Sequence, residues 1–309
     1  MDAAHDETEK QLARMERKLK SIYTRAGSGL KVNWRKYLEE ISPAIEEAQK
    51  AYDEAMKSGN AEEISKAEKR LTAVKRDKIM MDSRYRRMID QTAAELSQVN
   101  ETALAYINGE IPKVYIQNFI AVESGIEEAV AGYSFELVDQ NTVKRLIVDG
   151  EKSLLPAASQ KTLNKIEKTL ARGKDTRWNT RKINAEILQG ILQGESMQKI
   201  SGRLQKVAGM NASSAIRNAR TMVTGAENAG RMDMLHKATS DGIQVERTWI
   251  ATIDGRTRHS HAVLDGETKP IDTEFSNGLM YPGDVNGDPS EIYNCRCTLG
   301  YKVIGFAKI

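Results

Sequence analysis

The run TWIATIDGRTRHSH at Thr248–His261 and the run YNCRC at Tyr293–Cys297 indicate the fold of the C-terminal part of this chain. The first run belongs to Val245–Thr252, which is rich in the β-branched and aromatic residues that favour strands. The second opens Cys295–Val303, which has the pattern of a closing strand. Both cysteines and two of the four histidines lie in these two runs. We therefore expect a small sheet that carries a concentration of reactive side chains.

Turns and helices surround these strands. Asp265-Gly266 is a hairpin turn signal, and Tyr281–Pro289 is a turn-rich loop. Upstream, the pattern from Gln160 predicts four amphipathic helices. One carries Ile183, Ile187 and Ile191, the next extends from Ser196 to Gly209, and the last from Ser213 to about His236. Helices followed by a short sheet predict an α+β unit over residues 160–309.

The N-terminal third is predicted to be helical. Residues up to Ser58 indicate two helices, the second beginning at Ser42-Pro43, and Asn60 is a cap for a third that extends to Asn108. Gly109 and Pro112 are expected to end it. Its apolar stripe would pack against partner helices or another subunit, or within a bundle of its own N-terminal neighbours.

These patterns together define the expected organisation. Residues 1–110 form a helical arm with one long helix, 111–159 a connector, and 160–309 the C-terminal domain. The predicted fold class is α+β, with a long helical N-terminal arm, then a helical bundle and a small C-terminal β-sheet. The connector is expected to include a short extended segment around Phe135–Val138.

The amino-acid composition limits the classes of protein to which this chain can belong. Charged residues make up 29% of the 309 residues, aromatics 6%, and the mean hydropathy is −0.53, which favours exposed helix over an all-β sandwich. The net charge of +3 does not imply general affinity for nucleic acid. Two cysteines in Cys-x-Cys fit a reducing compartment. The polar N-terminus is not a signal peptide, and no apolar run approaches the ~20 residues of a membrane span, so we expect an aqueous setting without a membrane partner.

The histidines and cysteines are the metal candidates. His259 and His261 share the i,i+2 spacing of Cys295 and Cys297, and two imidazoles with two thiols suit tetrahedral zinc. The spacing is not that of the usual zinc fingers. The alternative is that the thiols pack as small apolar groups while the histidines bond to loop backbone. An i,i+2 disulfide would be strained.

A catalytic interpretation stays open beside the structural one. Asp254, His259, His261 and Asp284 could hold a metal ion for hydrolysis, or Cys295 and His261 could form a nucleophile and its base. The sequence shows no third orienting group, so no catalytic residue is assigned. It also has no phosphate-binding glycine loop, which excludes an ATPase motor.

Two sets of arginines have alternative roles. Arg256, Arg258 and Arg296 are expected to bond to carbonyls and carboxylates around the sheet, with phosphate contact as the alternative. On the last helix, a polar stripe either faces solvent or forms a buried seam beneath the C-terminal segment. It consists of Arg217, Arg220, Thr224, Asn228 and Arg231, with Glu227 placed to pair with Arg231. If the protein binds DNA, Arg217, Arg220, Arg231 and the segment Lys161–Arg181 are the candidate contacts.

The ordered series of motifs resembles the Mu F-like head morphogenesis domain of tailed bacteriophages. Ala219–Thr221 and Asn228–Arg231 are similar to that domain's last helix, and Asn108–Tyr115 resembles the form found in phages of Gram-positive hosts. The positions that carry the family motif are Trp249, Asp254, Arg256, Arg258, His261, Asp265, Gly266, Pro282, Asp284, Asn294, Cys295, Arg296 and Cys297.

The resemblance implies a minor head protein that binds the portal, enters the procapsid with capsid or scaffolding proteins, and acts in DNA packaging or ejection. It places the protein in the virion head interior, and in the bacterial cytoplasm during assembly. Some relatives carry cysteines at the positions of Arg258 and His261, so here His259 would have to supply a fourth zinc ligand. A DNA-binding module inside the capsid and a metal-dependent hydrolase are the alternatives.

Overall fold

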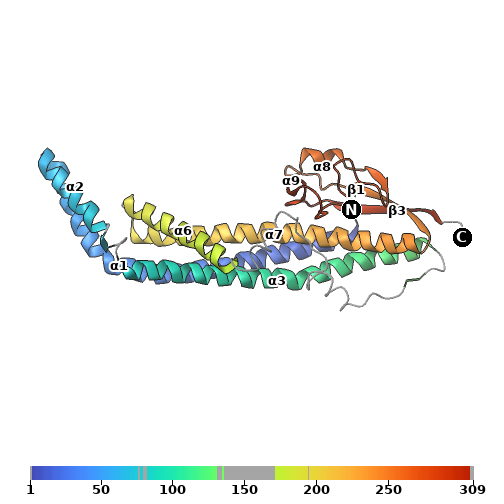
Figure 1. Cartoon of the computed structure of the whole chain (residues 1–309), viewed down its shortest axis with the longest axis horizontal. Helices are drawn as coiled ribbons and strands as arrows, with labels where there is room; N and C mark the ends of the chain where they lie inside the picture. Colours follow the sequence, from blue (N-terminus) through green and yellow to red (C-terminus); the bar gives the residue numbers. More distant parts are fainter. Residues whose placement is uncertain are drawn as a thin grey trace. The chain divides into compact units, whose positions relative to one another are not determined.

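The computed structural model describes residues 2–75, 77–78, 82–130, 134–135, 171–193 and 195–306. The helices are α1 (Ala3–Ser58), α2 (Ala61–Lys75), α3 (Ser83–Ala129), α6 (Ala171–Leu192), α7 (Met197–Ser240), α8 (His259–Val263) and α9 (Pro289–Ile292). The strands are β1 (Ile243–Ile250), β2 (Thr268–Pro270) and β3 (Thr298–Phe306). Figure 1 shows long helices along most of the chain and a small sheet near its C-terminal end. This confirms the predicted α+β class.

The chain divides into two compact units, each built from segments distant in sequence. The first, called the C-terminal unit because it contains the sheet, comprises Met1–Leu19, Thr102–Lys165 and Ser214–Ile309. The second unit comprises Lys20–Glu101 and Ile166–Ser213. The long helices α1, α3 and α7 each contribute to both units. The units therefore do not follow the linear division of the chain predicted from sequence.

The core of the second unit forms where α1, α3, α6 and α7 meet. Ile183, Ile187 and Ile191 of α6 are buried there, so the predicted apolar face of that helix is confirmed. Trp34 of α1 lies at its centre, fully buried, with its ring edge-on to Tyr37 and Tyr85. The Trp34 indole N–H donates to the Thr92 hydroxyl at 2.8 Å, which satisfies the one polar atom of the side chain.

Several predicted helix ends are wrong. α1 continues through Ser42-Pro43, where Ser42 bonds to Glu46 one turn on instead of capping a new helix. α3 continues through Gly109 and Pro112 to Ala129, because Ile111 and Val114 on both sides of the proline are buried. Likewise α7 passes Gly209 without ending. In each case the buried apolar face stabilises the helix more than the breaker residue destabilises it.

The predicted long helix from Asn60 to Asn108 is in fact two helices. Asn60 does cap α2, because its side chain accepts the backbone N–H of Glu62 at 3.0 Å. α2 ends at Lys75, and α3 begins after Asp82, whose carboxylate accepts the N–H of Arg84 at 2.7 Å. The predicted first helix after Gln160 and most of the extended segment at Phe135–Val138 lie outside the described residues.

The sheet is antiparallel with the strand order β2-β1-β3. Trp249 pairs with Leu299, and Arg247 lies between Tyr301 and Lys269. Ile243, Val245, Arg247 and Trp249 share the buried face of β1. The beginning of β3 is bonded to α7 at the Asn228 side chain, so the sheet lies on the C-terminal half of that helix.

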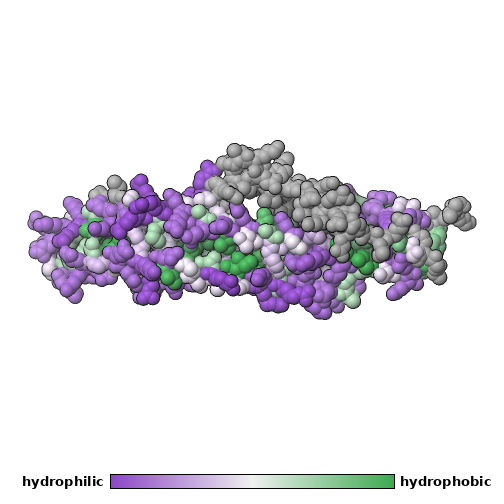
Figure 2. Space-filling view, turned by 90° about the horizontal axis from the view of Figure 1, so that it is seen from below, coloured by the Kyte–Doolittle hydropathy of each residue, from purple (hydrophilic) through white to green (hydrophobic). Residues whose placement is uncertain are grey.

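The face shown in Figure 2 is mostly hydrophilic, with hydrophobic residues in small separate patches. Among the helices of the described ranges, none has the length and apolar character needed to cross a membrane.

Candidate functional site

His261, Cys295 and Cys297 form a buried cluster. The Nδ1 atom of His261 lies 3.5 Å from Cys295 Sγ and 3.4 Å from Cys297 Sγ. Each of the three residues is at most 2% exposed, and both cysteines are free thiols. The cluster joins α8 to the segment before β3.

The local backbone explains why the two thiols face the imidazole. Asn294 has φ 56°, a left-handed conformation that asparagine tolerates, and it turns the chain between α9 and the Cys-x-Cys segment. The N–H of Cys295 donates to Ile292 O at 3.1 Å. Arg258 donates to the carbonyl oxygens of Glu291 and Tyr293, which ties α8 to the same turn. The expected structural role of Arg258 is confirmed.

The other side of the His261 ring meets aromatic and acidic groups. Trp249 is fully buried and lies edge-on to the imidazole, with ring centroids 5.2 Å apart. Nε2 of His261 is 2.9 Å from Glu291 Oε2, an ion-pair distance without the alignment of a hydrogen bond. The Ser260 hydroxyl donates to the same carboxylate. The ring is therefore fixed on three sides.

The two thiols have opposite pKa shifts. The hydrogen bond from the Cys295 thiol, together with His261, lowers the pKa of Cys297 to about 5, despite burial. The same interaction with Cys297, together with burial, raises the pKa of Cys295 well above its usual value. The two shifts are opposite because the thiols titrate as one coupled pair.

These three residues are the only group of His, Cys, Asp or Glu side chains in the described part of the chain that is arranged to hold a metal ion. Two thiol sulfurs and an imidazole nitrogen are donors that suit zinc. His259 is exposed and is not part of the group, so it does not supply the expected fourth ligand.

The residues of the hydrolase alternative are not brought together. Asp254 is held by Arg296 through two bonds of 2.6 and 2.7 Å, and this pairing lowers its pKa. The Asp284 carboxylate accepts the N–H groups of Met280 and Asn286 within its own loop. Because Cys295 is only 1% exposed, its thiol is also poorly placed to attack a substrate.

The polar stripe of α7 is a buried seam from Thr224 to Arg231, whereas Arg217 at its beginning is exposed. Thr224, Glu227, Asn228 and Arg231 are each at most 3% exposed. Thr224 donates to Cys295 O at 2.6 Å, and Asn228 donates to Cys297 O at 3.1 Å and accepts the N–H of Leu299 at 2.7 Å. The α7 side chains therefore bind the backbone of the Cys-x-Cys segment and the start of β3. The interpretation of the stripe as a buried seam is confirmed for Thr224, Asn228 and Arg231, and it is wrong for Arg217.

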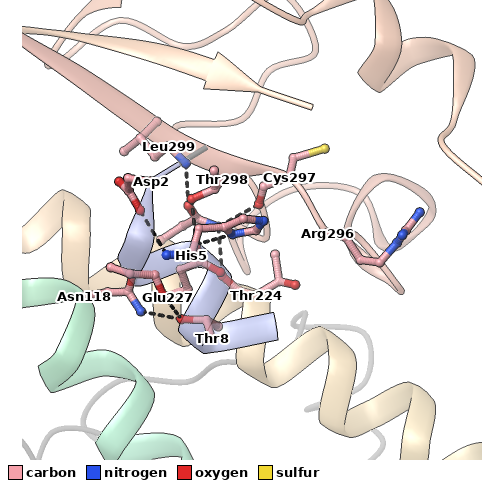
Figure 3. A network of polar contacts seen from close by, with 12 residues as sticks. Asp2, His5, Thr8, Asn118, Thr224, Glu227, Arg296, Cys297, Thr298 and Leu299 are labelled. Atoms are coloured by element: carbon pink, nitrogen blue, oxygen red, sulfur yellow. Dashed lines mark hydrogen bonds and ion pairs between the residues drawn. The ribbon is translucent and has the colours of Figure 1, made fainter. Parts of the chain in front are cut away.

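The N-terminal residues complete this seam (Figure 3). The Arg231 guanidinium donates to Asp2 at 2.6 and 2.7 Å, to Asn118 at 3.0 Å and to Leu299 O at 3.1 Å. These interactions lower the pKa of Asp2 to about 2, against the opposing effect of burial. His5 lies 2.7 Å from Glu227, which also accepts the Thr298 hydroxyl. Burial lowers the pKa of His5, but the bond to Glu227 outweighs it and the net pKa is raised.

The candidate DNA-contacting arginines have three different environments. Arg231 is 1% exposed and saturated with protein partners, so it cannot contact DNA in this fold, and that prediction is wrong. Arg220 pairs with Glu16 at 2.5 Å. Arg217 is exposed and lies over the Tyr293 ring. Of the segment Lys161–Arg181, residues 161–170 lie outside the described residues.

The family-motif positions outside the cluster have structural contacts. Asp265 accepts the N–H of Ala251 at 2.8 Å, and Gly266 follows it with φ 81°. Arg296 pairs with Asp254, as expected for a carboxylate partner, whereas Arg256 is largely exposed beside the same carboxylate. Pro282 and Asp284 are buried in the loop that packs on α7.

Arg247 is a site residue that sequence reasoning missed. It is fully buried, donates to Pro270 O at 3.0 Å and to the carbonyls of Thr273 and Met280, and lies over the Phe275 ring. The available signal was an arginine at a position where the strand alternation predicts an inward-facing apolar residue. Asp2 and His5 carried no such signal, because their partners are more than 200 residues away.

Comparison with known proteins defines the class of this chain. Residues 181–300 match the family described as Phage Mu protein F like protein. The chain is 26% identical over 231 residues to "Minor head protein GP7" of Bacillus phage SPP1, covering 72% of this chain and 70% of that protein. Together these findings identify a Mu F-like minor head protein of a tailed bacteriophage, which confirms the resemblance seen in the sequence.

A second relative shares only a part of its length. "NAD(+)--arginine ADP-ribosyltransferase EFV" of Enterococcus faecalis is 31% identical over 118 residues, covering 38% of this chain and 24% of the relative. A match to one quarter of an enzyme does not transfer its activity. No solved structure matches the chain.

Proposed function

We propose that this minor head protein binds the portal of its phage and acts in procapsid assembly and in DNA packaging or ejection. One observation carries the proposal: the alignment with the SPP1 minor head protein covers 231 residues, whereas the family segment is only residues 181–300. The similarity therefore extends beyond the F-like segment. A phage head protein acts by contacting other components of the head, and we propose that the portal is one of these components.

The fold of this chain suits a structural protein that is bound within a larger assembly. Its C-terminal unit is held together by buried charge pairs and by side-chain bonds to the backbone, including those of Arg231 and Arg247. The long helices provide surface along which a neighbouring subunit can pack. We place the protein in the head interior of the virion, and in the host cytoplasm during assembly, with no enzymatic role.

The test is co-expression of the tagged chain with the portal protein of the same phage, followed by purification and mass measurement of the complex. Recovery of a portal complex that persists at high salt supports the proposal. A chain that leaves the portal free but binds double-stranded DNA, with affinity falling steeply with salt, supports the DNA-binding alternative instead.

Packaging is tested separately in infected cells. Phage lacking the gene for this chain, complemented by the wild-type gene, should differ from uncomplemented phage in the amount of DNA per head or in the fraction of particles that eject. Equal values for both would refute a role in packaging and ejection while leaving portal binding intact.

A further inference from the structure

We propose that His261, Cys295 and Cys297 bind one Zn²⁺ ion that joins α8 to the Cys-x-Cys segment. The inference goes beyond the role in the phage head, because it concerns how the C-terminal unit is held together. It rests on the geometry of three side chains that come from two segments more than 30 residues apart.

The distances between the donor atoms fit one tetrahedral ion. With Zn–S about 2.3 Å and Zn–N about 2.0–2.1 Å, a tetrahedral angle separates sulfur and nitrogen ligands by about 3.6 Å. The Sγ atoms of Cys295 and Cys297 lie 3.5 and 3.4 Å from Nδ1 of His261. All three donor atoms are within 4.8 Å of one another, so one ion can reach them without a backbone rearrangement.

The surroundings of the imidazole fit a metal on Nδ1. A histidine that binds a metal through one nitrogen usually directs the other toward a carboxylate, which fixes the ring and its tautomer. Here Nε2 faces Glu291 at 2.9 Å, and the same carboxylate is held by Ser260. Nε2 is buried, and its contact with Glu291 does not have the alignment of a hydrogen bond.

Burial also fits an ion that stabilises the fold. The three ligands are at most 2% exposed, and Trp249 covers the edge of the imidazole. The carbonyl groups of both cysteines are bonded to α7, so an ion here would fix α8, the segment before β3 and α7 together. His259 is outside the cluster, so it does not supply a fourth ligand.

The experiment measures metal in the full chain, purified under reducing conditions without chelator. We expect about one zinc per chain by mass spectrometry, and its loss in Cys295→Ser, Cys297→Ser and His261→Ala. His259→Ala is the matched control, because this histidine is close in sequence but exposed, and it should retain the metal. Equal loss in His259→Ala and His261→Ala, or zinc retained in both cysteine variants, would overturn the assignment.

A second measurement covers the case in which a variant does not fold. Wild-type protein is stripped with chelator and titrated with Co²⁺, whose tetrahedral thiolate complexes give strong visible bands and a charge-transfer band in the near ultraviolet. Saturation at one Co²⁺ per chain with both features, reversed by Zn²⁺, supports the proposal. Folded, reduced wild-type protein that contains no zinc and gives no such bands refutes it.

Discussion

The imidazole of His5 lies 2.7 Å from the carboxylate of Glu227, a residue 222 positions further along the chain, and both side chains are at most 3% exposed. The pair brings the first turn of α1 onto α7 beside the start of β3. Because Thr298 and Arg231 contact the same carboxylate, a single acidic side chain on α7 connects the N-terminal residues to the C-terminal sheet.

The pair predicts a pH dependence of stability. The pKa of His5 is raised above 6.5, so the protonated imidazole stabilises the folded state fully below that value, and the contribution is lost as the pH rises through the raised pKa. His5→Gln removes this titration, so the difference in stability between wild type and variant should shrink with rising pH. Urea unfolding at several pH values between about 5 and 9 measures it.

His259→Gln is the control for His5→Gln, because His259 is exposed. The charged groups around His5 are Glu227, Glu9, Asp2 and Arg231, and burial raises the pKa of Glu9. A wild-type-to-variant difference that stays constant over the whole range would contradict the predicted titration.

Replacement of Arg231 should destabilise the C-terminal unit severely. Arg231→Met removes the bonds to Asp2, Asn118 and Leu299 O, and breaking one partner of a buried ion pair typically costs about 3–5 kcal/mol. The exposed Arg217 on the same helix is the control, since surface substitutions usually stay within about 0.5 kcal/mol. Similar unfolding midpoints for Arg231→Met and Arg217→Met would show that the seam does not stabilise the fold.

Gly283 should not tolerate alanine. It has φ 83°, and an added Cβ would lie 3.1 Å from the backbone nitrogen of Gly225 on α7. Gly266 has nearly the same φ, 81°, but open space around it. Alanine at Gly266 should therefore cost about 1 kcal/mol from backbone strain alone, and alanine at Gly283 more, because the loop must also move away from α7. Equal losses of thermal stability in Gly266→Ala and Gly283→Ala would exclude the close approach of Gly283 to α7.

Truncation of Trp34 tests the core of the second unit. Trp34→Ala removes a fully buried ring and should cost about 3–5 kcal/mol. Trp34→Phe keeps most of the packing but leaves the Thr92 hydroxyl without the indole donor, so its cost should be smaller. Chemical denaturation followed by circular dichroism measures the stability of both variants. If Trp34→Ala were as stable as the wild type, the core of the second unit would not depend on Trp34.

The predictable parts of the fold were those whose signal is local. The spacing of Ile183, Ile187 and Ile191 predicted a buried face, and Asn60 predicted a cap, because both depend on residues within one or two helical turns. The helix ends expected at Pro43, Gly109 and Gly209 were wrong, because burial of the neighbouring apolar residues depends on segments that are distant in sequence.

The site shows the same division. The sequence by itself determined which reactive residues the chain has, and the order of its motifs was enough to identify the Mu F-like family. Only the tertiary structure decided that His261 and not His259 faces the two thiols, and that Arg231 lies in a buried seam with Asp2 and not on an open surface. The physical reason is that a side chain's charge state, partners and exposure depend on which distant segments pack against it, and residue spacing does not encode that packing.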